Sequence, residues 1–203
     1  AEDEAAASSR SAIKFVGKNL VTAIFVLDLD SYQSLNMANL ILSVQRRQMP
    51  ARFGVVLHAS SPAGELATKL TLHVAKKCGG MGVGLQFVDI MAQLAGRMGG
   101  AVNDQVVTMA YQYMGQTCGN SIARLDAVSK TKNYDAYFGI VRDYVRAKGF
   151  HDSLPVAALN GRILVSQEIE RQLGQVLLQE MDELKELVRD GTITDETTDV
   201  HEL

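Results

Sequence analysis

The spacing of apolar residues changes twice along this chain, and this change restricts the folds that the chain can adopt. Continuous runs of β-branched and aromatic residues at 20–27 and 53–58 predict strands that are buried on both faces. Over 63–149 the apolar residues instead recur every three or four positions, which predicts about five helices. Strand-like runs return within 155–165. We therefore expect an α/β protein that contains an all-helical insertion.

Turn and cap signals connect these segments. A helix is expected over 33–47, and Pro50 ends it because the residue before a proline is pushed out of the helical region. Strand, helix and strand with short links imply a right-handed parallel crossover. The dipeptide Asn160-Gly161 between two apolar runs predicts a tight hairpin, and Ser166 is expected to cap a long final helix.

The same changes of pattern predict the domain boundaries. Residues 18–62 and 150–191 are expected to form the α/β core, and residues 63–149 the inserted helical subdomain. The polar, aperiodic ends predict a disordered leader over 1–17 and a disordered tail over 192–203. The inserted helices are expected near 65–78, 84–98, 101–114, 120–131 and 134–148, with Asn120 and Asn133 as caps of the last two.

The composition argues against several classes of function. Twenty basic and 23 acidic side chains give a net charge of -3 without a basic block, so a nucleic-acid partner is not expected. The longest mainly apolar run, 20–27, is far shorter than the roughly 20 residues that a membrane-spanning helix needs, so no membrane span is expected. The four histidines are scattered without the spacing of metal ligands, and we expect neither a metal nor a cofactor.

Two acids follow the first predicted strand. Asp28 and Asp30 have a spacing with which nucleotide-sugar enzymes can hold a divalent metal. They can equally form an ordinary polar exit from a buried strand, with Asp30 or Ser31 as the cap of the next helix. The second interpretation is favoured.

The two cysteines, Cys78 and Cys118, form no Cys-x-x-Cys motif, so they build neither a dithiol redox site nor a zinc knuckle. A disulfide between them would stabilise the fold by roughly 4 kcal/mol on the chain-entropy estimate. Two free buried thiols are an equal alternative, and nothing in the local sequence decides between them.

The order of the elements, with Leu154-Pro155 entering the third strand, resembles the thioredoxin-like fold, a βαβ unit followed by a ββα unit. The insertion takes the place that it has in bacterial disulfide oxidoreductases with a helical lid. The resemblance implies that Pro155 is cis and lies beside the active-site position. A thioredoxin enzyme needs a thiolate there, at the start of the helix after the first strand. In this chain that place reads "LDLDSYQSL", which contains no sulfur, so dithiol chemistry is not expected.

Three stretches carry a more specific resemblance: "GKNLVTAIFVLD", "QMPARFGVV" and "GFHDSLPVAALNGRIL". Over 18–58 and 149–165 the chain resembles a thioredoxin-like domain, the third, of a fungal UDP-glucose:glycoprotein glucosyltransferase. That family senses folding in the lumen of the endoplasmic reticulum. The resemblance implies a non-catalytic domain whose partners are misfolded glycoproteins and the other domains of the same polypeptide. A structural spacer and an atypical thioredoxin-like oxidoreductase are the alternatives.

A misfolded client would be recognised through its exposed apolar side chains, so apolar surface is the expected site. The final helix carries one continuous apolar stripe, which would be exposed if this terminal helix detached; plain packing in the core is the alternative. Methionines in the insertion suit either core filling or contact with varied clients. The candidate residues are Ile169, Leu173, Val176, Leu177, Met181, Leu184, Leu187 and Val188 in the stripe, and Met81, Met91 and Met98 in the insertion.

Overall fold

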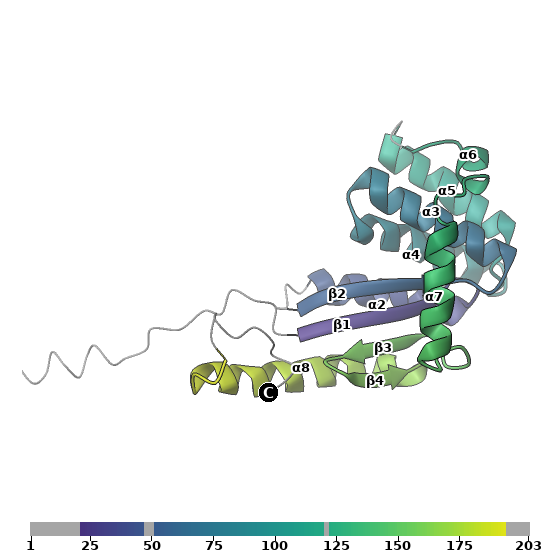
Figure 1. Cartoon of the computed structure of the whole chain (residues 1–203). Coiled ribbons are helices and arrows are strands. Elements are labelled where there is room, and N and C mark those ends of the chain that lie inside the picture. The colour runs from purple at the N-terminus through teal and green to yellow at the C-terminus, as the bar shows by residue number, and fades with distance from the viewer. Residues whose placement is uncertain (1–20, 47–50, 120–121, 194–203) are drawn as a thin grey trace, which may run out of the picture.

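A four-stranded mixed sheet organises the chain (Figure 1). The structure, a computed structural model, describes residues 21–46, 51–119 and 122–193. The order of the strands is β2-β1-β3-β4, in which β2 lies parallel to β1 and the remaining neighbours are antiparallel. The sheet thus joins a βαβ unit to a ββα unit, as predicted. The strands are β1 (Val21–Asp28), β2 (Ala51–His58), β3 (Val156–Leu159) and β4 (Arg162–Val165).

The helices follow the predicted order. One helix crosses from β1 to β2, five lie between β2 and β3, and one closes the described part of the chain. They are α2 (Tyr32–Arg46), α3 (Pro62–Cys78), α4 (Met81–Arg97), α5 (Asp104–Cys118), α6 (Leu125–Ser129), α7 (Asp135–Ala147) and α8 (Gln167–Arg189).

The predicted hairpin and cis-proline are confirmed. Asn160, with φ of 44°, and Gly161, with φ of 87°, form the two-residue turn between β3 and β4. Both residues have the positive φ that this turn requires. The peptide bond between Leu154 and Pro155 is cis.

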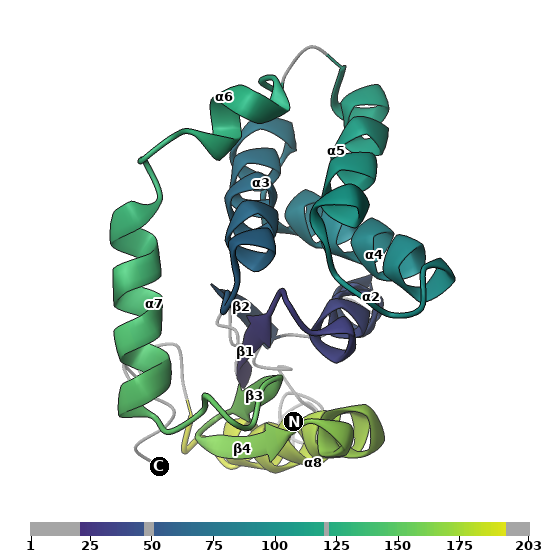
Figure 2. The same ribbon diagram turned by 90° about the vertical axis from the view of Figure 1, so that its right-hand side faces the viewer.

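The two faces of the sheet are covered by different helices. Phe25 and Leu27 of β1 belong to the main apolar core, which includes α2 and α8. Val26 belongs to a second apolar cluster with Val141 and Val145 of α7. Figures 1 and 2 show α3 to α6 gathered in one group beside the sheet, with α7 apart from them and crossing the direction of β1 and β2. The helical spacing of its apolar residues places α7 within the predicted insertion. In the structure α7 packs on the sheet, because its apolar side chains contact Val26 of β1 and Val156 of β3.

The rest of the insertion continues the core of the sheet. Helix α4 packs against α2, α3 and α5, and a single apolar cluster extends from β1 through α2 into these helices. A disulfide between Cys78 and Cys118 joins the ends of α3 and α5, with Cα atoms 5.7 Å apart. This bond decides between the two alternatives that the sequence left open.

Several helix caps differ from the predicted ones. Asn120 lies outside the described residues. Asn133 is not a cap, because α7 begins one residue later, after Tyr134, without a side-chain cap. Ser166 occupies the cap position of α8, but with φ of 46° and ψ of -118° its side chain makes no capping hydrogen bond. Asn103 instead caps α5, since its Oδ1 accepts from the Val106 N–H at 3.0 Å.

The described ranges contain no helix whose length and apolar content would let it cross a membrane.

Candidate functional site

The junction between β1 and α2 is the place where a thioredoxin enzyme would carry its cysteines. Here Ser31, just before the helix, and Ser34, in its first turn, stand in a Ser-x-x-Ser spacing. Ser31 is the cap of α2: its carbonyl accepts from the Leu35 N–H at 3.0 Å, and its Oγ accepts from the Ser34 N–H at 3.5 Å. Ser34 is fully buried, and its Oγ accepts from the Asp28 N–H at 3.1 Å. These hydroxyls join strand to helix and cannot exchange a disulfide.

Asp30 connects this junction to the start of the insertion. Its Oδ2 accepts from the backbone N–H groups of Ser60 at 2.5 Å and Ser61 at 2.8 Å. Its Oδ1 also accepts from the Ser61 hydroxyl. Gly64, in the first turn of α3, faces this carboxylate so closely that a Cβ would overlap it. The Asp30 carboxylate therefore lies at the positive end of α3, and local donors engage both of its oxygens.

Asp28 faces His58 at the ends of the two parallel strands. Its Oδ1 accepts from the Asp30 N–H at 3.0 Å, and its Oδ2 accepts from the Ser60 hydroxyl at 3.1 Å. His58 Nδ1 lies 3.8 Å from Asp28 Oδ2, too far for a hydrogen bond. Burial raises the pKa of Asp28, but His58 and the hydrogen bonds outweigh it and hold the pKa below its usual value.

This polar cluster lacks the arrangement of a nucleophile with its base. The Ser60 hydroxyl donates to Asp28, and no imidazole of the described residues accepts its proton. Among the described residues, no three His, Cys, Asp or Glu side chains converge as metal ligands. The Asp28 and Asp30 carboxylates act as acceptors that join β1, α2 and α3, in agreement with the favoured interpretation.

Tyr137 ties α7 to the outer edge of the sheet, a contact that the sequence did not predict. Its hydroxyl accepts from the Leu57 N–H at 2.8 Å and donates to the Leu57 carbonyl at 3.2 Å. Because β2 is the edge strand of the described sheet, these backbone groups have no strand partner among the described residues. Burial raises the pKa of Tyr137, and the hydrogen bond with Leu57 opposes that rise.

The predicted stripe on α8 faces the main core. Three of its residues are half-buried and pack against the core: Met181, Leu187 and Val188. The neighbouring Leu178 is outside the stripe and is 57% exposed. The fully covered residues are Ile169, Leu173, Val176, Leu177 and Leu184.

Few polar contacts hold α8 in place. Asn160 Nδ2 donates to Glu180 Oε2 at 3.0 Å, while Asn160 Oδ1 accepts from the Thr22 N–H at 2.9 Å. The turn residue thus connects β1 to the middle of α8. Near the start of α8, Glu168 Oε2 accepts from the Val165 N–H at 3.5 Å. The attachment of α8 is otherwise apolar in the described part of the chain.

The three methionine candidates lie in different environments. Met91 is fully buried, which supports core filling at this position. Met81 is half-buried against the core, and Met98 is 38% exposed just after α4. The structure does not bring these three side chains and the α8 stripe into one surface.

Solved structures share this architecture. The chain is similar to BdbD from Bacillus subtilis, with 10% identity, a TM-score of 0.60 and coverage of 82% of this chain and 90% of that chain. It is also similar to a thioredoxin-like oxidoreductase from Silicibacter pomeroyi, with 13% identity, a TM-score of 0.59 and coverage of 80% and 87%. A third similar structure is the oxidoreductase DsbA from Xylella fastidiosa, with 16% identity, a TM-score of 0.56 and coverage of 86% of this chain and 88% of that chain. At these identities the likeness shows the fold alone.

A family comparison extends over nearly the whole sequence. No curated protein matches the chain. A family model described as a thioredoxin-like domain matches residues 8–203. The strand order, the cis-proline before β3 and the helical insertion agree with that match. This chain belongs to the thioredoxin-like domain family.

Proposed function

We propose that this chain is a non-catalytic domain of the folding sensor of the endoplasmic reticulum, UDP-glucose:glycoprotein glucosyltransferase. In this proposal the domain binds exposed apolar surface of misfolded glycoproteins, and a separate catalytic domain of the same polypeptide glucosylates their N-glycans. The stretches at 18–58 and 149–165 that resemble this enzyme support the assignment.

The chemistry of the cysteines supports a binding role over an oxidoreductase. The start of α2 carries Ser31, its cap, and Ser34, in its first turn, in place of reactive thiols. Cys78 and Cys118 lie at the last residues of α3 and α5, where the negative end of the helix dipole disfavours a thiolate. Their disulfide is suited to a structural role and to an oxidising compartment such as the lumen of the endoplasmic reticulum.

The attachment of α8 is the observation that carries the proposal. A helix of 23 residues covers the sheet through an apolar stripe and is tied to the turn by one side-chain hydrogen bond among the described residues. Such an element can open locally at less cost than global unfolding. Opening would expose two matched apolar surfaces, the stripe and the sheet face that holds Phe25. Recognition would then depend on how much apolar surface a client exposes, with modest affinity.

Hydrogen exchange of the chain tests the opening of α8. We expect the amides of α8 to exchange through a local opening, faster than those of β1. Leu177→Ala should accelerate α8 further, because it removes a fully buried contact, whereas Leu178→Ala, at the exposed neighbouring position, should not. Protection of α8 as deep as that of β1 would rule out the detachable helix.

Client binding is tested with a chemically denatured glycoprotein, with its native form as the control. The denatured form should bind, and Leu177→Ala should strengthen binding by raising the population of the open state. If neither the denatured nor the native form binds more than an inert control protein does, the domain is a structural spacer. Reduction of insulin disulfides, lost on replacing Cys78 or Cys118, would indicate an oxidoreductase instead.

A further inference from the structure

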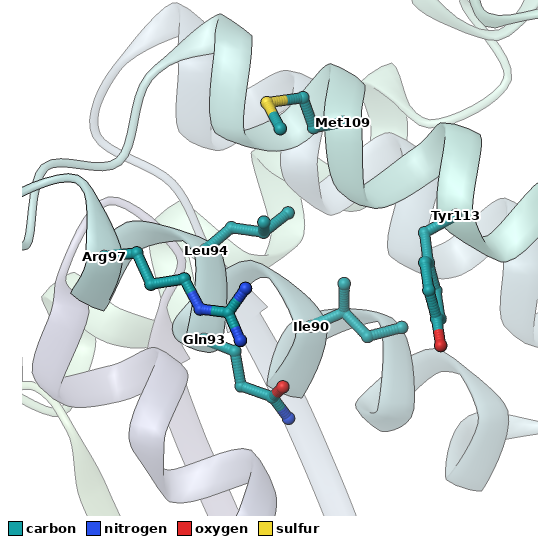
Figure 3. A pocket seen from close by; sticks show the side chains of 6 residues that line it. All are labelled: Ile90, Gln93, Leu94, Arg97, Met109 and Tyr113. Carbon is teal, nitrogen blue, oxygen red and sulfur yellow. The ribbon is translucent and has the colours of Figure 1, made fainter.

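A groove lies between α4 and α5 on the outside of the insertion (Figure 3). Its volume is about 400 Å³, within the range of about 300–1,000 Å³ typical of ligand sites. It is remote from the α8 stripe, since α8 packs on the sheet and makes its contacts with β1, β3 and β4. The lining residues are Ile90, Gln93, Leu94, Arg97, Met109 and Tyr113.

The apolar side chains of this groove are only partly covered by the rest of the insertion. Met109 and Tyr113, one turn apart on α5, are 42% and 58% exposed. Ile90 and Leu94, one turn apart on α4, are half-buried and form the floor. Together these four side chains form one apolar surface over two neighbouring helices.

Arg97 gives the groove a charge at one end. It is exposed, and it forms no ion pair with any carboxylate of the described residues. Figure 3 shows its guanidinium extended over the groove near Gln93, while Tyr113 lies at the opposite end. The amide nitrogen of Gln93 is already engaged, since it donates to Asp89 at 2.9 Å. The groove therefore offers a cation that a carboxylate of the partner can pair with.

We propose that the α4/α5 groove binds an amphipathic helical segment of a partner protein, with apolar residues over the groove and an acidic residue at Arg97. The distance along α4 from Ile90 to Arg97 is about 10 Å at 1.5 Å per residue, which matches two turns of a partner helix. Apolar residues at i and i+4 then meet the floor, and an acidic residue one turn further reaches the guanidinium. This inference rests on the proposed function for the kind of partner but does not require α8 to open.

A pair of synthetic peptides tests the inference with the intact chain. Each is a helical peptide of about 16 residues, long enough to form turns in water, with two leucines four positions apart and either Glu or Gln four positions further on. Methyl resonances of Ile90 and Met109 report on the groove, and those of Leu177 and Leu178 report on α8. We expect the Glu peptide to shift the groove methyls in a saturable way and to leave the α8 methyls unchanged.

Variants of the groove separate its apolar part from its charge. Tyr113→Ala should weaken both peptides about tenfold, as for an aromatic contact at an interface. Arg97→Gln should weaken the Glu peptide about threefold, as for an exposed ion pair, and leave the Gln peptide unchanged. Arg142→Gln, at an exposed position on α7, is the matched control and should change neither. Amide spectra of each variant confirm that the fold is retained.

The remaining outcomes overturn the inference. Shifts confined to the α8 methyls, or no shifts at all, would remove the groove as a binding site, while the binding of denatured glycoprotein decides the proposed function separately. An equal effect of Arg97→Gln on both peptides would remove the acidic anchor. Tighter saturable binding of decanoate than of the Glu peptide would assign the groove to a small amphiphile instead of a protein segment.

Discussion

The helices on the two faces of the sheet, α7 and α8, both cover it with apolar residues but are attached differently. Helix α7 is tied to the edge of the sheet by two hydrogen bonds between the Tyr137 hydroxyl and the backbone of Leu57. Helix α8 is the last described element and has one side-chain tie to the turn, between Glu180 and Asn160. Apolar cover on both faces therefore does not mean equal anchorage, and the predictions below test whether α8 opens independently.

The largest effect is expected from a cavity in α8. Leu173→Ala should lower the free energy of unfolding by about 2–5 kcal/mol, because it truncates a buried leucine. Part of that loss should appear as faster local exchange of α8 alone. Val145→Ala, the matched change in α7, should raise the exchange of α7 and β1 together. Urea unfolding measures the loss of stability in each variant, and hydrogen exchange measures which amides are affected. If Leu173→Ala accelerates exchange throughout the chain, α7 and α8 do not differ in anchorage.

A smaller effect is expected at the edge of the sheet. Tyr137→Phe leaves the Leu57 N–H and carbonyl without their hydroxyl partner, which should cost about 1–3 kcal/mol. Urea unfolding measures the loss, and hydrogen exchange should show it at the amide of Leu57. The control is Tyr113→Phe, whose exposed hydroxyl should contribute little to stability. Equal stabilities of the two variants would mean that the tie does not anchor α7.

A still smaller effect is expected at the tie of α8. Glu180→Ala removes the acceptor of Asn160 and should cost about 0.5–1.5 kcal/mol, mainly as faster exchange in α8. Glu183→Ala removes a contact with Gln179 within the helix and serves as the control. If both variants exchange alike, α8 is held by its apolar stripe alone.

The smallest expected effect depends on pH. The folded-state pKa of Asp28 lies below its ordinary value of 3.8. Its carboxylate therefore adds stability that is fully present above that value and is lost as the pH falls from 3.8 through the folded-state pKa. Urea unfolding near pH 6 and near pH 3 should show a decrease that Asp28→Asn reduces and Asp143→Asn does not. An unchanged pH dependence in Asp28→Asn would contradict the assignment.

The sequence predicted what local patterns determine. The resemblance to the thioredoxin-like fold implied the cis bond of Pro155. Local patterns did the rest: continuous β-branched runs located β1 and β2, and Asn160-Gly161 located the hairpin. These signals act within a few residues, so they can be read from one chain.

Contacts between distant residues were harder to predict. The period of α7 indicates which of its faces is apolar, but not that this face meets Val26 of the sheet. Asp30 was weighed as a cap of α2, whereas its partners Ser60 and Ser61 lie 30 and 31 residues away. The α4/α5 groove was missed because the sequence does not show that Met109 and Tyr113 remain exposed.

The disulfide between Cys78 and Cys118 has a consequence for molecular recognition. It links the ends of α3 and α5, and α4 packs against both of these helices. The cross-link limits how far α5 can move away from α4. The two helices that line the groove are therefore held at a fixed separation before a ligand binds. Less conformational freedom is then lost when the complex forms. A cross-link outside the groove thus makes the insertion a pre-organised receptor, whereas α8 would gain its adaptability by having no such restraint.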